Sequence, residues 1–280
     1  MITNSLSLIR VKDWLKNILL FLPLVFSGKL IQYNLYTELF LSFFLFSLAS
    51  SFIYILNDIK DLEDDKKHLI KKIKKPLASN KLTLSYAYKL MFFLIFLITG
   101  YILVNNSLFY HIIIYILINI CYSIYLKKIP FLEIILISFG YLIRLDAGSQ
   151  IINVETSLLL SSAVFSLAFF VISIKRYVEI TNQYTKRTKL KFYSPNILYI
   201  LIFLSALLFI FLSLVFFIIS KSILIVSTPI LIFILYRYFK VADGSNLGEF
   251  PIEVIIKDKL LFVSGLVLFL FTIFIYIISI

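Results

Sequence analysis

Long apolar blocks alternate with short polar connections along this chain. Nine blocks are long enough to cross a membrane as helices, since about 20 apolar residues span the hydrocarbon core. They cover residues 17–35, 39–56, 84–104, 108–126, 130–151, 158–174, 195–219, 222–239 and 260–280. The pattern predicts an all-α, polytopic membrane protein with about nine transmembrane helices, forming a single domain over residues 1–280.

Composition supports the membrane class. The mean hydropathy is +1.00 and 15% of the residues are charged, whereas about a quarter of the residues of a soluble domain are charged. The single cysteine, Cys121, excludes an internal disulfide, and the two histidines, His68 and His111, are too few and too far apart to predict a metal site.

The positive charges gather in alternate connections. One set carries 23 of the 27 Lys and Arg residues and comprises residues 1–16, 57–83, 127–129, 175–194 and 237–259. Because such loops stay on the cytoplasmic side, we expect the N-terminus inside and the C-terminus outside. We also expect a polar cavity that faces the cytoplasm, in a protein of a bacterial inner membrane. Topology and anionic lipid headgroups explain the charge pattern, and no motif for reading nucleic acid accompanies it.

The densest acidic segment follows the second predicted span. The pattern N-D-x-x-D-x-x-x-D is formed by Asn57, Asp58, Asp61 and Asp65. At about 100° per residue, the three aspartates fall on one face of a helix, where they repel each other. A hard cation such as Mg²⁺ removes that cost and also binds substrate phosphates. We therefore predict that all three bind Mg²⁺ and that Asp58 and Asp61 are catalytic; the alternative is a solvated acidic helix end.

A basic segment comes directly after the acidic one. Its lysines include Lys71, Lys72 and Lys75. Cations in this place could neutralise the acidic segment, or they could hold the outer phosphates of a metal-bound diphosphate. The second interpretation predicts that these lysines, together with Asn57, bind substrate.

Four further sequence blocks occur in order along the chain. They are "RVKDWLKN" (10–17), "YLIRLDAG" (141–148), "KRYVE" (175–179) and "ADGSNLGEFPIEVIIKD" (242–258). With the acidic motif, they resemble the intramembrane prenyltransferase (UbiA) superfamily. Most members have a second Asp-rich motif after the sixth span, but this chain has Lys175 and Arg176 there. The combination resembles the decaprenyl-phosphate phosphoribosyltransferase branch over nearly the whole chain.

The chain departs from this branch at several positions. Val11 stands where members usually have Pro, Leu69 replaces the Pro of a usual His-Pro pair, and Lys75 replaces the Arg before Pro76. These differences leave the acidic motif intact and fall partly in the predicted phosphate-binding segment.

The resemblance also implies a set of substrate-binding residues outside the acidic segment. They are Lys16, Asn17, Tyr141, Arg144, Lys175, Arg176, Tyr177 and Glu179. An Arg fork matches phosphate oxygens, which favours a substrate role for the basic members. Lys16 could instead be a surface anchor of the first span, Arg144 could pair with Asp146 or Glu155, and Lys175 with Glu179 at i,i+4.

The function implied by the resemblance is Mg²⁺-dependent transfer of 5-phosphoribose. The donor would be phosphoribosyl diphosphate, the acceptor a polyprenyl phosphate, and the product a precursor of cell-envelope glycans. One alternative is an aromatic or quinone prenyltransferase that uses a polyprenyl diphosphate. A second is a membrane transporter or lipid-binding scaffold without enzymatic activity. The sequence leaves a homo-oligomer open.

Overall fold

The computed structural model describes residues 2–68, 71–126, 129–181, 193–220, 222–245 and 248–278. Parts of the predicted polar loops 57–83, 175–194 and 237–259, including the Leu69 position, therefore lie outside the described residues. Within the described ranges the chain is helical and contains no strand. The predicted all-α class is confirmed.

Within the described residues, fifteen helical elements follow one another. In order they are α1 (Ile2–Leu8), the 3₁₀ helix η1 (Val11–Phe21), α2 (Leu22–Phe26), α3 (Asn34–Lys60), α4 (Leu62–Lys67), α5 (Lys71–Lys74), α6 (Leu84–Val104), α7 (Phe109–Ile124), α8 (Leu132–Ile151), α9 (Leu158–Thr181), α10 (Pro195–Ile219), the 3₁₀ helix η4 (Ile223–Ser227), α11 (Thr228–Asp243), α12 (Pro251–Lys257) and α13 (Lys259–Ile278).

Seven helical segments within the described residues are long and apolar enough to cross a membrane. They are α3, α6, α8, α9, α10, the continuous segment Ile223–Asp243 and α13. Helix α7 is apolar but shorter, and the predicted first span, residues 17–35, is instead formed by η1 and the short helix α2. The multi-pass architecture is confirmed, whereas the count of nine spans is not.

A close backbone contact holds η1 against α8. A Cβ atom added at Gly148 would lie 2.1 Å from the carbonyl oxygen of Leu20, so only glycine allows this approach. Asn17, buried in η1, donates a hydrogen bond to the Ser47 hydroxyl of α3 at 2.9 Å. Long 3₁₀ segments are uncommon because their hydrogen-bond geometry is poor. Contacts with the neighbouring helices therefore stabilise this one.

Replacing Gly148 by alanine is expected to destabilise the protein. The new methyl group would push the η1 backbone away from α8, and overpacking of this kind costs about 1–3 kcal/mol. Thermal unfolding in detergent measures the effect. Gly265→Ala is the matched control, because a Cβ atom added at this position of α13 would meet no neighbouring atom within 4 Å. An unchanged unfolding temperature for Gly148→Ala would contradict the contact.

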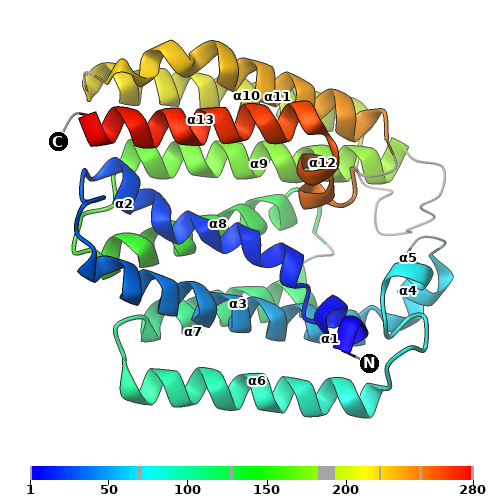
Figure 1. Ribbon diagram of the computed structural model, residues 1–280. Coiled ribbons are helices and arrows are strands. Elements are labelled where there is room, and N and C mark those ends of the chain that lie inside the picture. Colours follow the sequence, from blue (N-terminus) through cyan, green and yellow to red (C-terminus); the bar gives the residue numbers. More distant parts are fainter. Residues whose placement is uncertain are drawn as a thin grey trace.

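The helices form two packed groups joined by α8 and α9 (Figure 1). One apolar core contains buried residues of α3, α6 and α7, a second contains buried residues of α9, α11 and α13, and a smaller third contains buried residues of α8, α9 and α10. The short elements α1, α4, α5 and α12 gather at one end of the bundle, while the C-terminus lies at the opposite end (Figure 1). The acidic and basic segments after α3 therefore meet the loop before α12 at a single end of the molecule.

Candidate active site

A cavity of about 690 Å³ lies at the end of the bundle that carries α1, α5 and α12. Its cationic lining residues are Arg10, Lys12, Lys16, Lys71, Lys74, Lys75, Lys175 and Arg176. Its acidic lining residues are Asp13, Asp58, Asp61, Glu133, Glu179, Glu249 and Glu253. The two signs of charge nearly balance, so the partners of each group decide which charges remain for a ligand.

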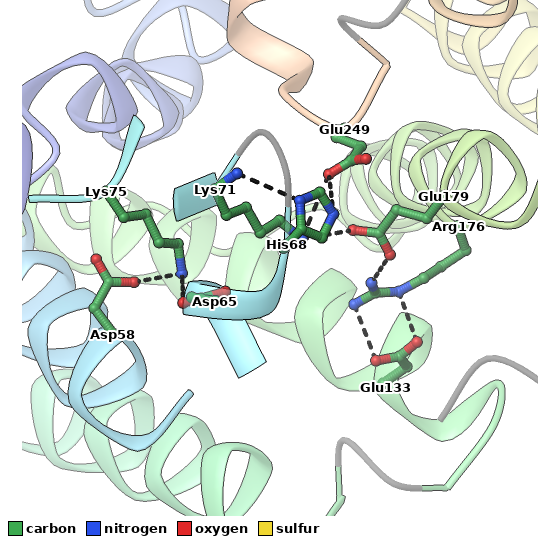
Figure 2. Close-up of polar contacts among 9 residues, drawn as sticks. All are labelled: Asp58, Asp65, His68, Lys71, Lys75, Glu133, Arg176, Glu179 and Glu249. Atoms are coloured by element: carbon green, nitrogen blue, oxygen red, sulfur yellow. Dashed lines mark hydrogen bonds and ion pairs between the residues drawn. The ribbon is translucent and has the colours of Figure 1, made fainter. Parts of the chain in front are cut away.

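The predicted acidic stripe is held together by a lysine (Figure 2). The ammonium Nζ of Lys75 lies 2.8 Å from Oδ1 of Asp58 and 2.5 Å from Oδ2 of Asp65. Arg10 donates from Nη2 to the same Asp58 oxygen at 2.5 Å. Both carboxylates are almost fully buried, with relative exposures of 2% and 1%. The structure thus brings these two predicted residues together, with cations already between and beside them.

The helix that carries the stripe is interrupted at its middle aspartate. Helix α3 ends at Lys60 and α4 begins at Leu62, and Asp61 between them has a non-helical backbone with φ −93° and ψ 8°. The sequence pattern placed all three aspartates on one continuous helix, and this prediction is wrong. Asp61 is half-buried and lines the cavity beside Asn57 and Asp58.

These oxygens suit a divalent cation bound jointly with a phosphate ligand. Among the described residues, no three His, Cys, Asp or Glu side chains form a ready-made metal cage. Mg²⁺ does not require one, because it is usually held by one or two carboxylates together with substrate phosphates and water. Asp58 and Asp61 present such carboxylates to the cavity, and Lys75 shows that the space between Asp58 and Asp65 accommodates a cation. The donor set therefore fits Mg²⁺.

Arg176 belongs to a buried ion cluster (Figure 2). Its Nε and Nη2 atoms lie 2.6 and 3.0 Å from the two carboxylate oxygens of Glu133, and Nη1 donates to Glu179. The hydroxyl of Tyr193 donates to Glu133 at 2.7 Å. The guanidinium fork is thus engaged by carboxylates, although it also borders the cavity.

A second part of this network joins segments that are distant in sequence. The Lys71 ammonium lies 3.4 Å from Glu249 and 3.9 Å from Glu179. The His68 ring lies 3.8 Å from Glu249 and is buried. His68 is thus part of the buried network and not an exposed loop residue. These contacts tie the basic segment after α4 to α9 and to the loop before α12.

Lys175 differs from the other cations of the cavity wall. It is half-buried on α9 and lines the cavity, yet within the described part of the chain no hydrogen bond or ion pair engages its ammonium. The alternative of an i,i+4 pair with Glu179 is not found, since Glu179 pairs with Arg176 and Lys71. Lys175 thus brings to the cavity an amino group that no carboxylate contacts within ion-pair distance among the described residues.

Lys16 lines the cavity and forms an ion pair with a nearby aspartate. Its ammonium lies 2.7 Å from Asp13 and donates to the Tyr54 hydroxyl at 3.4 Å. Burial disfavours the charged form of Asp13, but the Lys16 ammonium, assisted by Arg10, holds the pKa of Asp13 below its usual value. The carboxylate therefore stays ionised at neutral pH and offsets the charge of Lys16.

Arg144 is buried among neutral partners. It donates to the Asn17 side-chain oxygen and to the Gly140 carbonyl, both at 2.6 Å, and to the Tyr115 hydroxyl at 3.0 Å. The Tyr141 ring centroid lies 5.8 Å from the guanidinium carbon. None of these residues borders the cavity. The cluster positions η1 relative to α8.

The predicted structural partners of Arg144 are wrong. Asp146 instead accepts a hydrogen bond from Thr156 at 2.6 Å and lies 3.0 Å from His111, and no ion pair joins Arg144 to Glu155 among the described residues.

Two other predicted substrate residues lie away from the cavity. The Tyr177 ring packs against the rings of Tyr199 and Phe239, with centroids 6.3 and 6.1 Å apart. Lys72 is exposed and does not line the cavity. Their predicted contacts with substrate find no support in this geometry.

Comparisons with known proteins match this arrangement to one family. The family described as "UbiA prenyltransferase family" matches residues 21–249. The chain belongs to the UbiA family. The predicted resemblance is confirmed, the protein is a membrane transferase of this superfamily, and the transporter and scaffold alternatives are set aside.

Relatives within the UbiA family cover most of this chain. Decaprenyl-phosphate phosphoribosyltransferase of Mycobacterium tuberculosis is 28% identical over 277 residues, spanning 93% of this chain and 90% of that protein. The enzyme of the same name from Corynebacterium glutamicum is 30% identical, spanning 92% of this chain and 82% of that protein. A UbiA homologue from Archaeoglobus fulgidus, solved with DMAPP and Mg²⁺, has a TM-score of 0.67 at 18% identity and covers 95% of this chain and 98% of that one.

Several charged residues of this UbiA-family site escaped the sequence analysis. Glu133 lies inside a predicted span and Arg10 precedes the first one, and neither was assigned a role. An acidic residue within an apolar run was the available signal for Glu133, because such a group is rarely buried without a partner. Arg10 offered no comparable signal, since one arginine in a basic N-terminal segment is explained by topology.

Proposed function

We propose that this UbiA-family protein transfers 5-phosphoribose from phosphoribosyl diphosphate to a polyprenyl phosphate and releases diphosphate. The observation that carries the proposal is the unlike chemistry of the two cavity walls. Carboxylates of Asp58 and Asp61 lie on the α3 side, and the unengaged ammonium of Lys175 lies on the α9 side, where a second acidic motif is absent. The relatives named decaprenyl-phosphate phosphoribosyltransferase support transfer of a phosphoribosyl group to a prenyl phosphate acceptor.

Magnesium is part of the proposed reaction. Asp58 and Asp61, with Asp65 behind them, would hold it, and the A. fulgidus homologue was solved with this ion and a prenyl diphosphate. When bound, the ion would neutralise charge on the diphosphate leaving group. We place the site at the cytoplasmic face of a bacterial inner membrane, because connections rich in Lys and Arg are normally retained on that side.

The protein's own groups then bind and orient the two substrates. Lys175 would attract a phosphate group from the α9 side, and Lys71 and Lys75 would do so from the basic segment. The glycosidic C1–O bond to diphosphate breaks, and an oxygen of the lipid phosphate forms a new bond to C1. The lipid phosphate is ionised at neutral pH, so no general base is needed. Positive charge that develops at C1 would be favoured by the carboxylate-rich wall.

The proposal is tested with purified protein in detergent. Phosphoribosyl diphosphate labelled in its ribose, a polyprenyl phosphate and Mg²⁺ are incubated, with and without EDTA, and label is counted in the organic phase. We expect labelled lipid that depends on both the divalent cation and the lipid phosphate. The rival donor is tested in parallel with a prenyl diphosphate and an aromatic acceptor. Labelling in that arm alone would replace the proposal by aromatic prenyl transfer.

A further inference from the structure

Lys75 occupies the centre of the predicted metal stripe. Its ammonium contacts Asp58 at 2.8 Å and Asp65 at 2.5 Å, and Arg10 contacts Asp58 at 2.5 Å. These four residues hold two carboxylates and two cations, and Asp61 beside them adds one further carboxylate to the cavity wall. The two carboxylates are 2% and 1% exposed, so water screens them little.

A divalent cation entering alone would meet an aspartate pair, Asp58 and Asp65, that two cations already contact. It would bring two positive charges next to Lys75 and Arg10, and such repulsion is strong where water is excluded. A divalent cation that arrives with diphosphate is different, because the complex is net anionic. The phosphate oxygens then provide a second set of partners for the lysine ammonium.

We infer that Lys75 is an internal counter-cation that makes metal binding conditional on the diphosphate. In the absence of substrate it neutralises Asp58 and Asp65 and opposes the binding of free metal ions. When the metal diphosphate binds, its ammonium exchanges the carboxylates for phosphate oxygens. The inference rests on the proposed function, because the diphosphate belongs to the proposed donor.

The backbone around Lys75 confines this exchange to the side chain. Its N–H donates to the Lys71 carbonyl at 2.9 Å, and its own carbonyl accepts from Ser79 at 3.0 Å. The next residue, Pro76, is buried and has a fixed φ angle. A lysine ammonium is carried on a flexible stem of about four carbons, so it can reorient without moving such a backbone.

The adjacent Lys74 provides a matched control. Its ammonium lies 3.1 Å from Glu253 and 3.8 Å from the centroid of the Phe250 ring, and neither contact involves the aspartates. Lys74→Gln and Lys75→Gln therefore remove the same charge from neighbouring positions of one segment. Only the second removes charge from the acidic pair.

Binding of Mn²⁺ to the substrate-free protein tests the inference. The free-ion signal in electron paramagnetic resonance reports the dissociation constant in detergent without any phosphate. We expect Lys75→Gln to bind Mn²⁺ about tenfold more tightly than the wild type, or tighter still, because one opposing charge is removed. Lys74→Gln should match the wild type, and Lys75→Arg, which retains the cation, should remain weak. An equal or weaker affinity in Lys75→Gln would overturn the inference.

Thermal unfolding keeps the test decisive if Lys75→Gln is unstable. Without the ammonium, Asp58 and Asp65 repel each other, and Mn²⁺ should restore the lost unfolding temperature in this variant but leave the wild type unchanged. A variant that Mn²⁺ does not stabilise would also overturn the inference. Neither measurement involves phosphoribose transfer, so a failure here leaves the proposed function standing. A failed transfer assay, in turn, does not alter the Mn²⁺ result.

Discussion

Replacing Asp61 by asparagine is expected to lower phosphoribose transfer by about a hundredfold or more while leaving the protein folded. Asp61 lines the cavity at the break between α3 and α4, half-buried and outside the apolar cores. The amide keeps the shape of the side chain but removes a negative charge next to the proposed metal diphosphate. Label transferred to the organic phase measures the loss, and the thermal unfolding temperature checks the fold.

Glu63→Gln is the matched control for this prediction. Glu63 lies two residues further along the chain, is exposed, and pairs only with Lys66 at 2.9 Å among the described contacts. Loss of one acid from the same segment should here leave transfer close to that of the wild type. If both variants retained full transfer, the carboxylate of Asp61 would have no part in the reaction.

The second large effect is expected on stability. Replacing Arg176 by methionine would leave Glu133 and Glu179, which are 4% and 1% exposed, as buried carboxylates without their guanidinium. Removing one partner of a buried ion pair costs about 3–5 kcal/mol. Thermal unfolding in detergent should therefore show a marked loss of stability. Any loss of transfer should accompany unfolding.

Two further variants separate this structural role from direct phosphate binding. Arg176→Met leaves two buried carboxylates, Glu133 and Glu179, without the guanidinium. Adding Glu133→Gln removes one of these negative charges, so the double variant should recover part of the stability lost in Arg176→Met alone. Arg176→Lys keeps the charge but loses the fork that contacts both oxygens of Glu133. A stable Arg176→Met variant with no transfer would assign Arg176 to the substrate instead.

The membrane class and most spans could be predicted from the sequence because they depend on local composition. Apolar runs long enough for the hydrocarbon core became helices such as α3, α9 and α10. The first span could not be predicted in this way. Residues 11–26 form a 3₁₀ segment and a short α-helix, held by the close approach of Gly148 to Leu20. Such a contact joins residues that no local pattern relates.

The location of the candidate site was likewise predictable. Carboxylates and lysines are costly near a membrane, so a cluster of them indicates a functional site. Asn57, Asp58, Asp61, Lys71, Lys75 and Lys175 do line one cavity. Local spacing also suggested their chemistry, since oxygen ligands followed by cations suit a metal-bound diphosphate.

Only the tertiary structure decided which charges neutralise each other. Arg176 contacts Glu133, 43 positions away in sequence, and is engaged by carboxylates, whereas its neighbour Lys175 is not. Lys75, ten positions from Asp65, lies between two aspartates that the pattern had assigned to a metal alone. Sequence by itself determined which residue types gather at the end of the bundle, because that depends on hydropathy and local order. Their pairing depends on distances of a few ångströms between separate helices, and packing alone sets those distances.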